Sequence, residues 1–379
     1  MTRSDGRRLQ VLVVPEWYPT EASPVAGSFV SDQAQAASRF NDVVVAVDRP
    51  DGRPGTLRER AEGSVRVFEL SRRSRPGPAG VFSRVLALKK FIASRPTPPD
   101  VIHAHVYASG FVSLLASVGT GIPVVLSEHT SDFLEGLVTG RASIPAHAAL
   151  RGSALVCPVS DDLMRAMASF DHRGSYEVVP NVVDTEAFRN RRSGSASVGS
   201  GLLRLLSVGI MTRQKGFADL ISAAGLLHAA GLPIQLDLVG DGPLRAELER
   251  QAASSLPDGS FRFLGSLPRA EVATCMSEAD IYVMPSVVET FGVALVEALV
   301  AGLPVVATKV GIAPSVVSGE CGVVVAPGDA RALARGLESV AARLDRLDAW
   351  ATGDSLVERF SAETIGRRWD AIYRRVAGR

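Results

Sequence analysis

Several features that mark other protein classes are scarce in these 379 residues. The three cysteines, Cys157, Cys275 and Cys321, lie far apart in apolar surroundings, which indicates unpaired core thiols rather than disulfides or a zinc site. Basic residues (41) nearly balance acidic residues (40), so the chain lacks the charge excess of nucleic-acid-binding proteins. The first apolar run, residues 9–14, is too short for a signal peptide or a membrane span. We therefore expect a cytoplasmic protein without a nucleic-acid partner.

Three signature motifs are also missing. The sequence contains no P-loop, no Gly-x-Ser-x-Gly nucleophile elbow and no Asp-x-Asp pair to hold a metal–diphosphate complex. The turn Val-Gly-Asp-Gly-Pro at 239–243 lacks the third glycine of the dinucleotide fingerprint, because Arg245 stands in its place. This turn is interpreted either as a tight strand-to-helix turn or as a phosphate contact. We expect no metal, so protein cations and helix N-termini must neutralise any bound diphosphate.

Short apolar runs alternate with helical patterns along most of the chain, which predicts α/β architecture with parallel sheets. A stretch rich in Arg, Ser and Gly at 189–202 lacks apolar periodicity and is predicted to be a linker. The alternation predicts two Rossmann-like domains, residues 1–188 and 203–361, that face each other across a cleft. Residues 362–379 form a last helical pattern, with Trp369 and Tyr373 on one face, which is expected to pack back on the first domain.

The most informative stretch covers residues 280–311. An apolar run at 281–284 predicts a buried parallel strand, and residues 293–300 predict a helix that is buried on several sides. Glu297 is the only ionisable side chain between Thr290 and Thr308, and a buried carboxylate requires a partner. Glu289 follows the strand, just before a turn that contains Gly292. In open α/β sheets this is the edge where ligands bind.

A second group of polar residues follows the strand at 203–208. Arg213 and Lys215 lie between the end of this strand and the start of a helix, so that a phosphate could meet two cations and backbone N–H groups together. The alternative is a pair of solvated loop charges. We leave both interpretations open.

Polar side chains also follow the predicted strands of the first domain. His103 and His105 are two residues apart in one strand and so point to the same face. Glu128 and His129 end the next strand, and residues 27–28 end the loop after the first. We expect these strand ends to form one wall of a cleft. Asn181 lies near the end of the domain and is interpreted first as a turn-forming residue.

These motifs together resemble the retaining nucleotide-sugar glycosyltransferases of family 4, which have the GT-B fold of two Rossmann-like domains. The resemblance covers nearly the whole chain. Its most specific part is Pro-Ser-x-x-Glu-x-Phe-Gly-x-x-x-x-Glu-Ala at 285–298, followed by Ala-Gly-Leu-Pro-Val-Val-Ala-Thr at 301–308. The supporting motifs are Gly-Ser-Phe at 27–29, Asp-Val-Ile-His-Ala-His at 100–105, Pro-Asn-x-Val-Asp at 180–184, Lys-Gly at 215–216 and the turn at 239–243.

The resemblance implies roles for individual residues. Glu289 would contact hydroxyls of the donor sugar, with His105 beside it, and these two are the predicted catalytic residues. Glu297 would bind the ribose, while Lys215 and the backbone at 291–293 would hold the diphosphate. The predicted donor-binding residues are Glu297, Lys215, Arg213, Phe291, Gly292, Val293, Leu267 and Gly27. The predicted acceptor-side residues are Ser28, Glu128, His129 and Asn181.

One position departs from the family pattern. The family often carries an arginine directly after the glycine of the turn at 208–216, where this sequence has Ile210. Arg213 would then supply the cation from another backbone position, or phosphate binding would be weaker.

The implied reaction is metal-independent transfer of a hexose-type sugar, with retention, from a nucleotide diphosphate sugar to a hydroxyl acceptor. We favour a UDP-sugar and place a GDP-sugar next. The product would belong to glycan, glycolipid or natural-product biosynthesis. Two alternatives remain: a nucleotide-sugar epimerase on the same fold, and a nucleotide-sugar-binding protein without catalysis.

Charge is unevenly distributed along the first domain. Residues 49–95 contain twelve Arg or Lys and four Asp or Glu. A solvated basic surface is the interpretation that we favour. The alternative is peripheral contact with an anionic membrane at its inner face.

Overall fold

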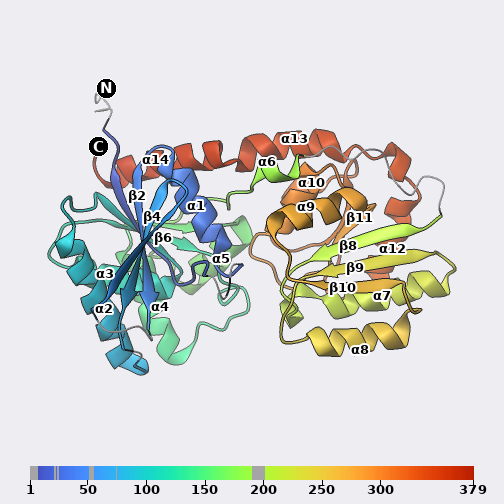
Figure 1. The fold of residues 1–379 in the computed structure, drawn as a ribbon, viewed down its shortest axis with the longest axis horizontal. Coiled ribbons are helices and arrows are strands. Elements are labelled where there is room, and N and C mark those ends of the chain that lie inside the picture. Colours follow the sequence, from blue (N-terminus) through green and yellow to red (C-terminus); the bar gives the residue numbers. More distant parts are fainter. Residues whose placement is uncertain (1–6, 21–22, 24, 51–54, 74, 190–200) are drawn as a thin grey trace. The chain divides into compact units, whose positions relative to one another are not determined.

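The computed structural model describes the chain except for residues 1–6, 21–22, 24, 51–54, 74 and 190–200. The chain divides into two compact units (Figure 1). The first unit comprises residues 1–182 and 362–379, and the second comprises residues 183–361. No helix in the described ranges is long and apolar enough to cross a membrane.

The first unit is built on a seven-stranded sheet with the order β3-β4-β2-β1-β5-β6-β7. Its strands are β1 (Gln10–Val14), β2 (Asp42–Arg49), β3 (Leu57–Glu62), β4 (Val65–Ser71), β5 (Val101–His105), β6 (Val124–Glu128) and β7 (Leu155–Pro158). All neighbouring strands pair in parallel except β3, which is antiparallel to β4 at the edge. The sheet is thus parallel as predicted, apart from this edge strand, which has no counterpart among the predicted apolar runs. Four of the six residues of β3 are exposed and four are charged, so it lacks the apolar run of a buried strand.

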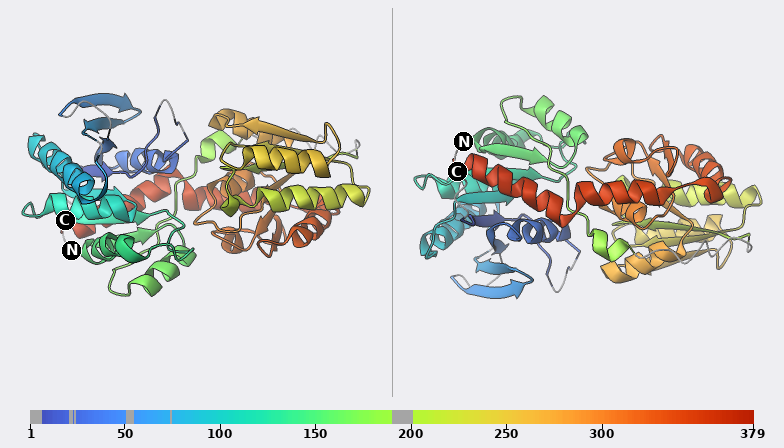
Figure 2. Two further views of the ribbon diagram at one scale, coloured as in Figure 1. Left: turned by 90° about the horizontal axis from the view of Figure 1, so that it is seen from below. Right: turned by 90° about the horizontal axis from the view of Figure 1, so that it is seen from above.

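Helices cover both faces of this sheet (Figure 2). They are α1 (Ser28–Ser38), α2 (Gly77–Ser94), α3 (Tyr107–Ser117), η1 (Gly140–Ala142), α4 (Ser143–Gly152), α5 (Asp161–Phe170) and α14 (Ala362–Val376). The core consists mainly of valines of the strands and the apolar faces of α1 and α14. Helix α5 begins at a capping serine, because the Ser160 hydroxyl accepts from the N–H of Leu163.

The second unit has a six-stranded sheet, entirely parallel, with the order β10-β9-β8-β11-β12-β13. Its strands are β8 (Leu203–Val208), β9 (Ile234–Val239), β10 (Phe261–Gly265), β11 (Ile281–Met284), β12 (Val305–Thr308) and β13 (Gly322–Val325). Its helices are α6 (Thr185–Phe188), η2 (Arg213–Lys215), α7 (Phe217–Ala229), α8 (Arg245–Ser255), α9 (Arg269–Glu278), α10 (Val293–Val300), α11 (Ala313–Val316), α12 (Ala330–Ala341), η3 (Leu344–Arg346) and α13 (Ala349–Phe360). Its separate core lies mainly between the sheet and helices α7, α8 and α12.

Some details differ from the sequence-based expectations. The units divide between Val182 and Val183 rather than after residue 188, because α6 packs on α9 and α10 of the second unit. Beside β7, the N–H groups of Glu177 and Val179 each donate one hydrogen bond to its backbone, but residues 177–179 do not form a strand. The predicted linker lies mostly outside the described residues. Of the cysteines, Cys157 and Cys321 are buried, whereas Cys275 is half-buried.

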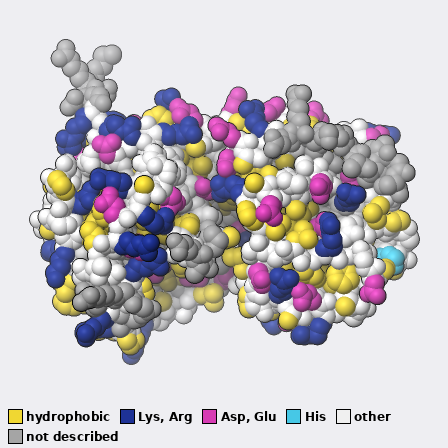
Figure 3. Space-filling view, viewed as in Figure 1, with side chains coloured by type: hydrophobic (Ala, Val, Ile, Leu, Met, Phe, Trp, Pro, Cys, Tyr) yellow, Lys and Arg dark blue, Asp and Glu magenta, His cyan; other side chains and the backbone are white. Residues whose placement is uncertain are grey.

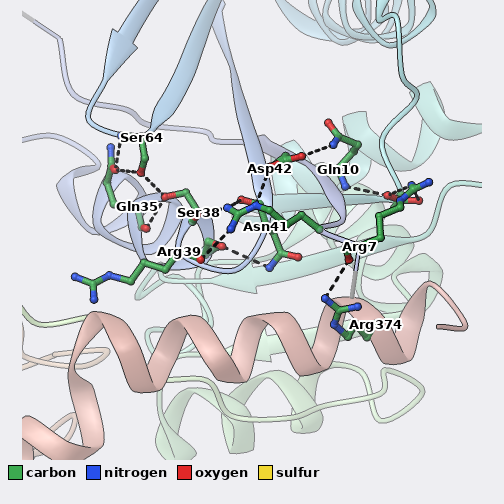
Figure 4. Close-up of polar contacts among 12 residues, drawn as sticks. Arg7, Gln10, Gln35, Ser38, Arg39, Asn41, Asp42, Ser64 and Arg374 are labelled. Atoms are coloured by element: carbon green, nitrogen blue, oxygen red, sulfur yellow. Dashed lines mark hydrogen bonds and ion pairs between the residues drawn. The ribbon is translucent and has the colours of Figure 1, made fainter. Parts of the chain in front are cut away.

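The last helix, α14, belongs to the first unit and packs against α1. At Gly366 the two helices come so close that a Cβ atom would lie 2.3 Å from the carbonyl oxygen of Ala36. Polar contacts join the same region to the start of the described chain (Figure 4). Arg374 Nη2 donates to the carbonyl of Arg7 at 3.3 Å. The end of the chain is thus an integral part of the first unit.

We predict that Gly366→Ala destabilises the protein, although alanine favours helices by about 1 kcal/mol over glycine. The added methyl group would meet backbone, so the helices must separate, which typically costs about 1–3 kcal/mol. Urea unfolding followed by circular dichroism measures the change. Ala371→Ser, on the exposed face of the same helix, should change stability by less than about 0.5 kcal/mol. A Gly366→Ala protein more stable than the wild type would contradict the close packing.

Candidate functional site

In the second unit, two predicted site residues meet where adjacent strands end. Strands β8 and β11 are neighbours, and the turn after β8 carries Lys215 while the loop after β11 carries Glu289. Lys215 Nζ lies 2.5 Å from Glu289 Oε2. The Glu289 carboxylate is 12% exposed and the Lys215 side chain 30%, so the ion pair is largely shielded from water. Such a pair is stronger than one on the open surface.

Backbone contacts hold these two loops together. The carbonyl of Gln214 accepts hydrogen bonds from the N–H groups of Val287 and Val288 at 2.7 and 3.2 Å. Gly216 has φ 65°, and a Cβ atom there would lie 2.0 Å from the carbonyl oxygen of Pro285. Only glycine fits this position, because another residue would be strained and would collide with backbone. In the Lys-Gly pair, Gly216 is therefore required by the packing of the two loops, while Lys215 has the predicted binding role.

Helix α10 starts directly after this loop. Gly292 is its N-cap residue, with φ 100°, and Val293 is its first residue. The first N–H groups of a helix have no partner within the helix, so they are available to an anion. Phe291 is buried, and its carbonyl accepts from the N–H of Ile312 at 2.8 Å. Glu297 lies one turn into the helix and is 8% exposed.

The turn at 239–243 is explained by backbone packing. A Cβ atom on Gly240 would lie 1.9 Å from the carbonyl oxygen of Gly209, and one on Gly242 would lie 2.7 Å from the N atom of Met211. Arg245 forms ion pairs with Asp241 and Glu249. These contacts favour the interpretation as a tight turn, since they account for both glycines without a phosphate.

Three other predicted positions lie near the same edge of this sheet. Arg213 is exposed in η2, and no ion pair joins it to any other described residue. Ile210 is also exposed (55%), so the position of the family arginine faces solvent. Leu267 follows β10 and is half-buried. Among the described residues, no hydrogen bond joins Leu267 to the Lys215–Glu289 pair.

In the first unit, three histidines form one buried cluster. His103 and His105 of β5 have ring centroids 4.3 Å apart, and His105 stacks on His129, which follows β6, at 5.3 Å. His103 is held on both sides: Nδ1 is 2.7 Å from the Tyr373 hydroxyl and Nε2 is 2.8 Å from the Ser127 hydroxyl. The expected wall of strand ends therefore includes α14, which supplies Tyr373.

One hydrogen bond links the protonation of two rings. His105 Nδ1 lies 3.0 Å from His129 Nε2, so one ring must donate and the other accept. The remaining nitrogens, His105 Nε2 and His129 Nδ1, are buried and find no hydrogen-bond partner among the described residues. If one of them carries a proton, the other carries a lone pair. A buried polar atom without a partner typically costs about 1–3 kcal/mol, so a water or a ligand that bonded to these two nitrogens would stabilise the cluster.

Burial keeps the three rings neutral. Desolvation lowers the pKa of His103 and that of His129 to about 3. It also lowers the pKa of His105 well below its usual value, with smaller repulsion from the two neighbouring rings. At neutral pH each ring therefore offers one donor and one acceptor rather than a positive charge.

Glu128 has a different environment from the histidines. Its Oε1 accepts from the N–H groups of His129 and Thr130 and from the Thr130 hydroxyl, and its Oε2 accepts from the N–H of Tyr107, all at 2.9 Å. Burial raises the pKa of Glu128, and these hydrogen bonds oppose the rise. The carboxylate thus joins the end of β6 to the start of α3. Contact with an acceptor stays a prediction.

The residue after His105 has an unusual backbone conformation. Val106 has φ 73°, the only positive φ of a described residue other than glycine. For a β-branched residue this costs about 1–3 kcal/mol, and it persists only where neighbours fix it. Here the N–H of Val106 donates to the Ser127 carbonyl at 2.8 Å, and Glu128 holds the next N–H. No sequence pattern predicts this backbone strain.

The remaining predicted residues lie around the same cluster. Gly27 is the N-cap residue of α1, which starts at Ser28, and the ring of Phe29 lies 4.5 Å from that of His129. Asn181, first interpreted as a turn residue, is buried and accepts from Gln33 Nε2 at 3.0 Å. Sequence reasoning missed Gln33. A polar residue at a buried position of an apolar helix face was the available signal.

No group of three or more His, Cys, Asp or Glu side chains within the described part of the chain is arranged to hold a metal ion.

Family models match both units of the chain. The model described as glycosyl transferase 4-like domain matches residues 26–182, and the model described as glycosyl transferases group 1 matches residues 196–351. Alpha-maltose-1-phosphate synthase of Mycolicibacterium smegmatis is 30% identical over 310 residues, which cover 73% of this chain and 79% of that protein. The chain belongs to the family 4 type of glycosyltransferases. The members of this family are enzymes. The resemblance to the family that was inferred from the sequence is confirmed.

Other similar proteins match this glycosyltransferase over part of their sequence or in their fold. Glycogen synthase of Mycobacterium tuberculosis H37Rv is 29% identical over 264 residues, which cover 67% of this chain but less than two thirds (63%) of that protein. Among solved structures, sucrose-phosphate synthase from Thermosynechococcus elongatus superposes with a TM-score of 0.80 at 21% identity, covering 98% of this chain and 100% of that one. Anabaena HepE in complex with UDP-glucose gives 0.75 at 20% identity, covering 96% and 99%. These likenesses confirm the GT-B fold class.

The buried histidines predict a loss of stability in acid. Unfolded histidines take up protons below about pH 6.5, whereas the folded rings resist protonation, so the unfolded state binds more protons. The free energy of unfolding should therefore be highest above this pH and fall as pH decreases, by up to about 1.4 kcal/mol per histidine per pH unit. Denaturant unfolding at a series of pH values measures this slope.

His103→Gln should reduce the slope by the share of one histidine, and His228→Gln, at an exposed position, should leave it unchanged. If His103→Gln does not fold, His129→Gln serves the same comparison. Equal slopes in the wild type and in the cluster variant would show that the folded ring titrates normally.

Proposed function

We propose that this glycosyltransferase moves a hexose-type sugar, with retention and without a metal, from a nucleotide diphosphate sugar to a hydroxyl acceptor. A UDP-sugar is the favoured donor and a GDP-sugar the next. The acceptor would belong to glycan, glycolipid or natural-product biosynthesis. Anabaena HepE, which shares the fold, was solved with UDP-glucose, and this supports the choice of UDP.

The observation that carries the proposal is the Lys215–Glu289 pair beside the start of α10. At this edge a half-buried ammonium, the exposed Arg213 and the first N–H groups of α10 provide positive charge from separate elements. A diphosphate carries negative charge that these groups can neutralise, so a metal ion is not required for charge balance.

Glu289 and Lys215 have distinct roles in this proposal. The Lys215 ammonium faces the diphosphate, and it stabilises the negative charge that grows on the leaving nucleotide. Glu289 keeps one oxygen on Lys215, while Oε1, which accepts from the Thr290 N–H at 3.2 Å, retains a lone pair for a sugar hydroxyl. Because the carboxylate is fixed on one side, its other oxygen is held in a defined orientation.

His105 binds the donor sugar through a neutral ring in the proposed reaction. Its Nδ1 is bound to His129, so Nε2 is the nitrogen that can exchange a hydrogen bond with a sugar hydroxyl. A neutral ring does not repel the positive charge that develops on the anomeric carbon. The low pKa of this buried ring is therefore suited to its proposed place.

Ligand binding gives the first test. Thermal shift is measured with UDP, GDP and ADP and with their sugars, since a ligand at a hundred times its Kd adds about 2.7 kcal/mol of stability. UDP and a UDP-hexose should give the largest shifts, and they should do so in the presence of EDTA. Incubation of the donor without acceptor, followed by NMR, should show no isomer. An isomer would instead indicate an epimerase, and stabilisation by none of the ligands would overturn the nucleotide-sugar site.

Variants separate the roles of the two glutamates. Glu289→Gln should lower kcat by about a hundredfold or more, because the neutral amide no longer balances Lys215 or supports the reacting sugar. Glu297→Ala should mainly raise the donor KM, since it removes a proposed contact with the ribose. Steady-state kinetics at saturating acceptor distinguish the two effects.

Glu247→Gln, an exposed change on α8, is the matched control and should leave both constants unchanged. Near-normal kcat for Glu289→Gln at saturating donor would refute the assignment of Glu289.

A further inference from the structure

Helix α2 exposes apolar side chains on the first unit. Phe82 is 63% exposed and Leu86, one turn later, is 41% exposed. The opposite face is buried through Leu88, Phe91 and Ile92, and the Phe91 ring lies 5.2 Å from that of Phe68 of β4. Phe82 and Leu86 are therefore not part of the apolar face that packs α2 on the core, because that face is formed by other residues.

The end of α3 extends this exposed strip. Leu115 is 40% exposed and Val118, just after the helix, is 64% exposed. Lys89 Nζ of α2 donates to the Val118 carbonyl at 3.5 Å, so the two helices lie side by side here. We call Phe82, Leu86, Leu115, Val118, Lys89 and Lys90 the α2 surface. In Figure 3 hydrophobic and basic side chains lie together at the lower end of this unit, where Figure 1 places α2.

Five of the described basic residues in 49–95 form ion pairs with carboxylates. The pairs are Arg49–Glu69, Arg60–Glu62, Arg66–Glu59, Arg72–Asp48 and Arg84–Glu16. Lys89 and Lys90 are exposed, and within the described ranges neither of them forms an ion pair. Helix α2 itself contains no Asp or Glu.

We propose that the α2 surface docks on an anionic lipid bilayer. Exposed Phe and Leu side chains would enter the boundary between head groups and acyl chains, and the two lysines would contact lipid phosphates. The combination favours lipid over an acidic protein, since cations without apolar neighbours would suffice for the latter. Arg73 and Arg75, both exposed just before α2, add positive charge at its other end.

Vesicle co-sedimentation of the full-length protein tests this proposal. The wild type should bind vesicles of phosphatidylcholine with phosphatidylglycerol and bind pure phosphatidylcholine much less, and added salt should weaken binding. The double variant Lys89→Gln, Lys90→Gln should weaken binding to the anionic vesicles roughly 25-fold, at roughly fivefold per charge. The double variant Phe82→Ser, Leu86→Ser should lose binding to a similar or greater extent.

Matched controls lie in the second unit. Leu226→Ser removes an exposed leucine, and the double variant Arg331→Gln, Arg335→Gln removes two exposed cations of α12. Both controls should bind as the wild type does. Circular dichroism verifies that every variant is folded.

Three outcomes would overturn the proposal: equal binding to neutral and anionic vesicles, no binding to either, or unchanged binding of both α2 variants. Binding of soluble polyglutamate that depends on Lys89 and Lys90, without vesicle binding, would assign the surface to an acidic protein instead. The measurement requires neither donor nor acceptor, so its failure leaves the proposed transferase activity standing.

Discussion

The ion pair between Lys215 and Glu289 is the contact on which the arrangement of the loops after β8 and β11 in the second unit depends. It joins the loops that follow two neighbouring strands, β8 and β11, and the Gln214 carbonyl and Gly216 bring their backbones together. Breaking such a shielded pair leaves an uncompensated charge with little water around it. Because the loop after β11 is fixed in this way, the start of α10 has a defined position, and its N–H groups are presented at the same edge.

The first unit is organised by a different constraint, which is the burial of neutral polar rings. His103 has hydrogen-bond partners on both sides, Ser127 from β6 and Tyr373 from α14, and the tilted ring of Trp369 lies against it with ring centroids 4.3 Å apart. The His103 ring, held in this way, packs against the ring of His105. His105 Nε2 has no hydrogen-bond partner among the described residues. The last helix of the chain is therefore required for the site as well as for the core.

Much of the fold could be predicted, since buried parallel strands are recognisable as apolar runs, as in β11 and β12. Strand β3 could not, because an exposed edge strand made of Leu-Arg-Glu-Arg-Ala-Glu has no apolar pattern. The positions of Glu289 and Lys215 after strands were also recognisable. Their pairing was not, because it depends on β8 and β11 being neighbours although 74 residues separate the two side chains. Likewise, the contact between Gln33 and Asn181 spans 148 positions and leaves no local signal.

The number of basic residues in a segment also does not show which of them are neutralised by carboxylates in the folded protein. A count over residues 49–95 treats all basic residues alike, but their effect on the surrounding potential depends on the nearest carboxylate. Arg72 and Arg84 are largely buried beside Asp48 and Glu16, so they contribute little field outside the protein. Lys89 and Lys90 of α2 form no ion pair within the described part of the chain, and they lie beside exposed apolar side chains. Unpaired positive charge thus remains on α2 and just before it, beside exposed apolar side chains, and this local charge, rather than the total, supports the proposed preference for an anionic and apolar partner.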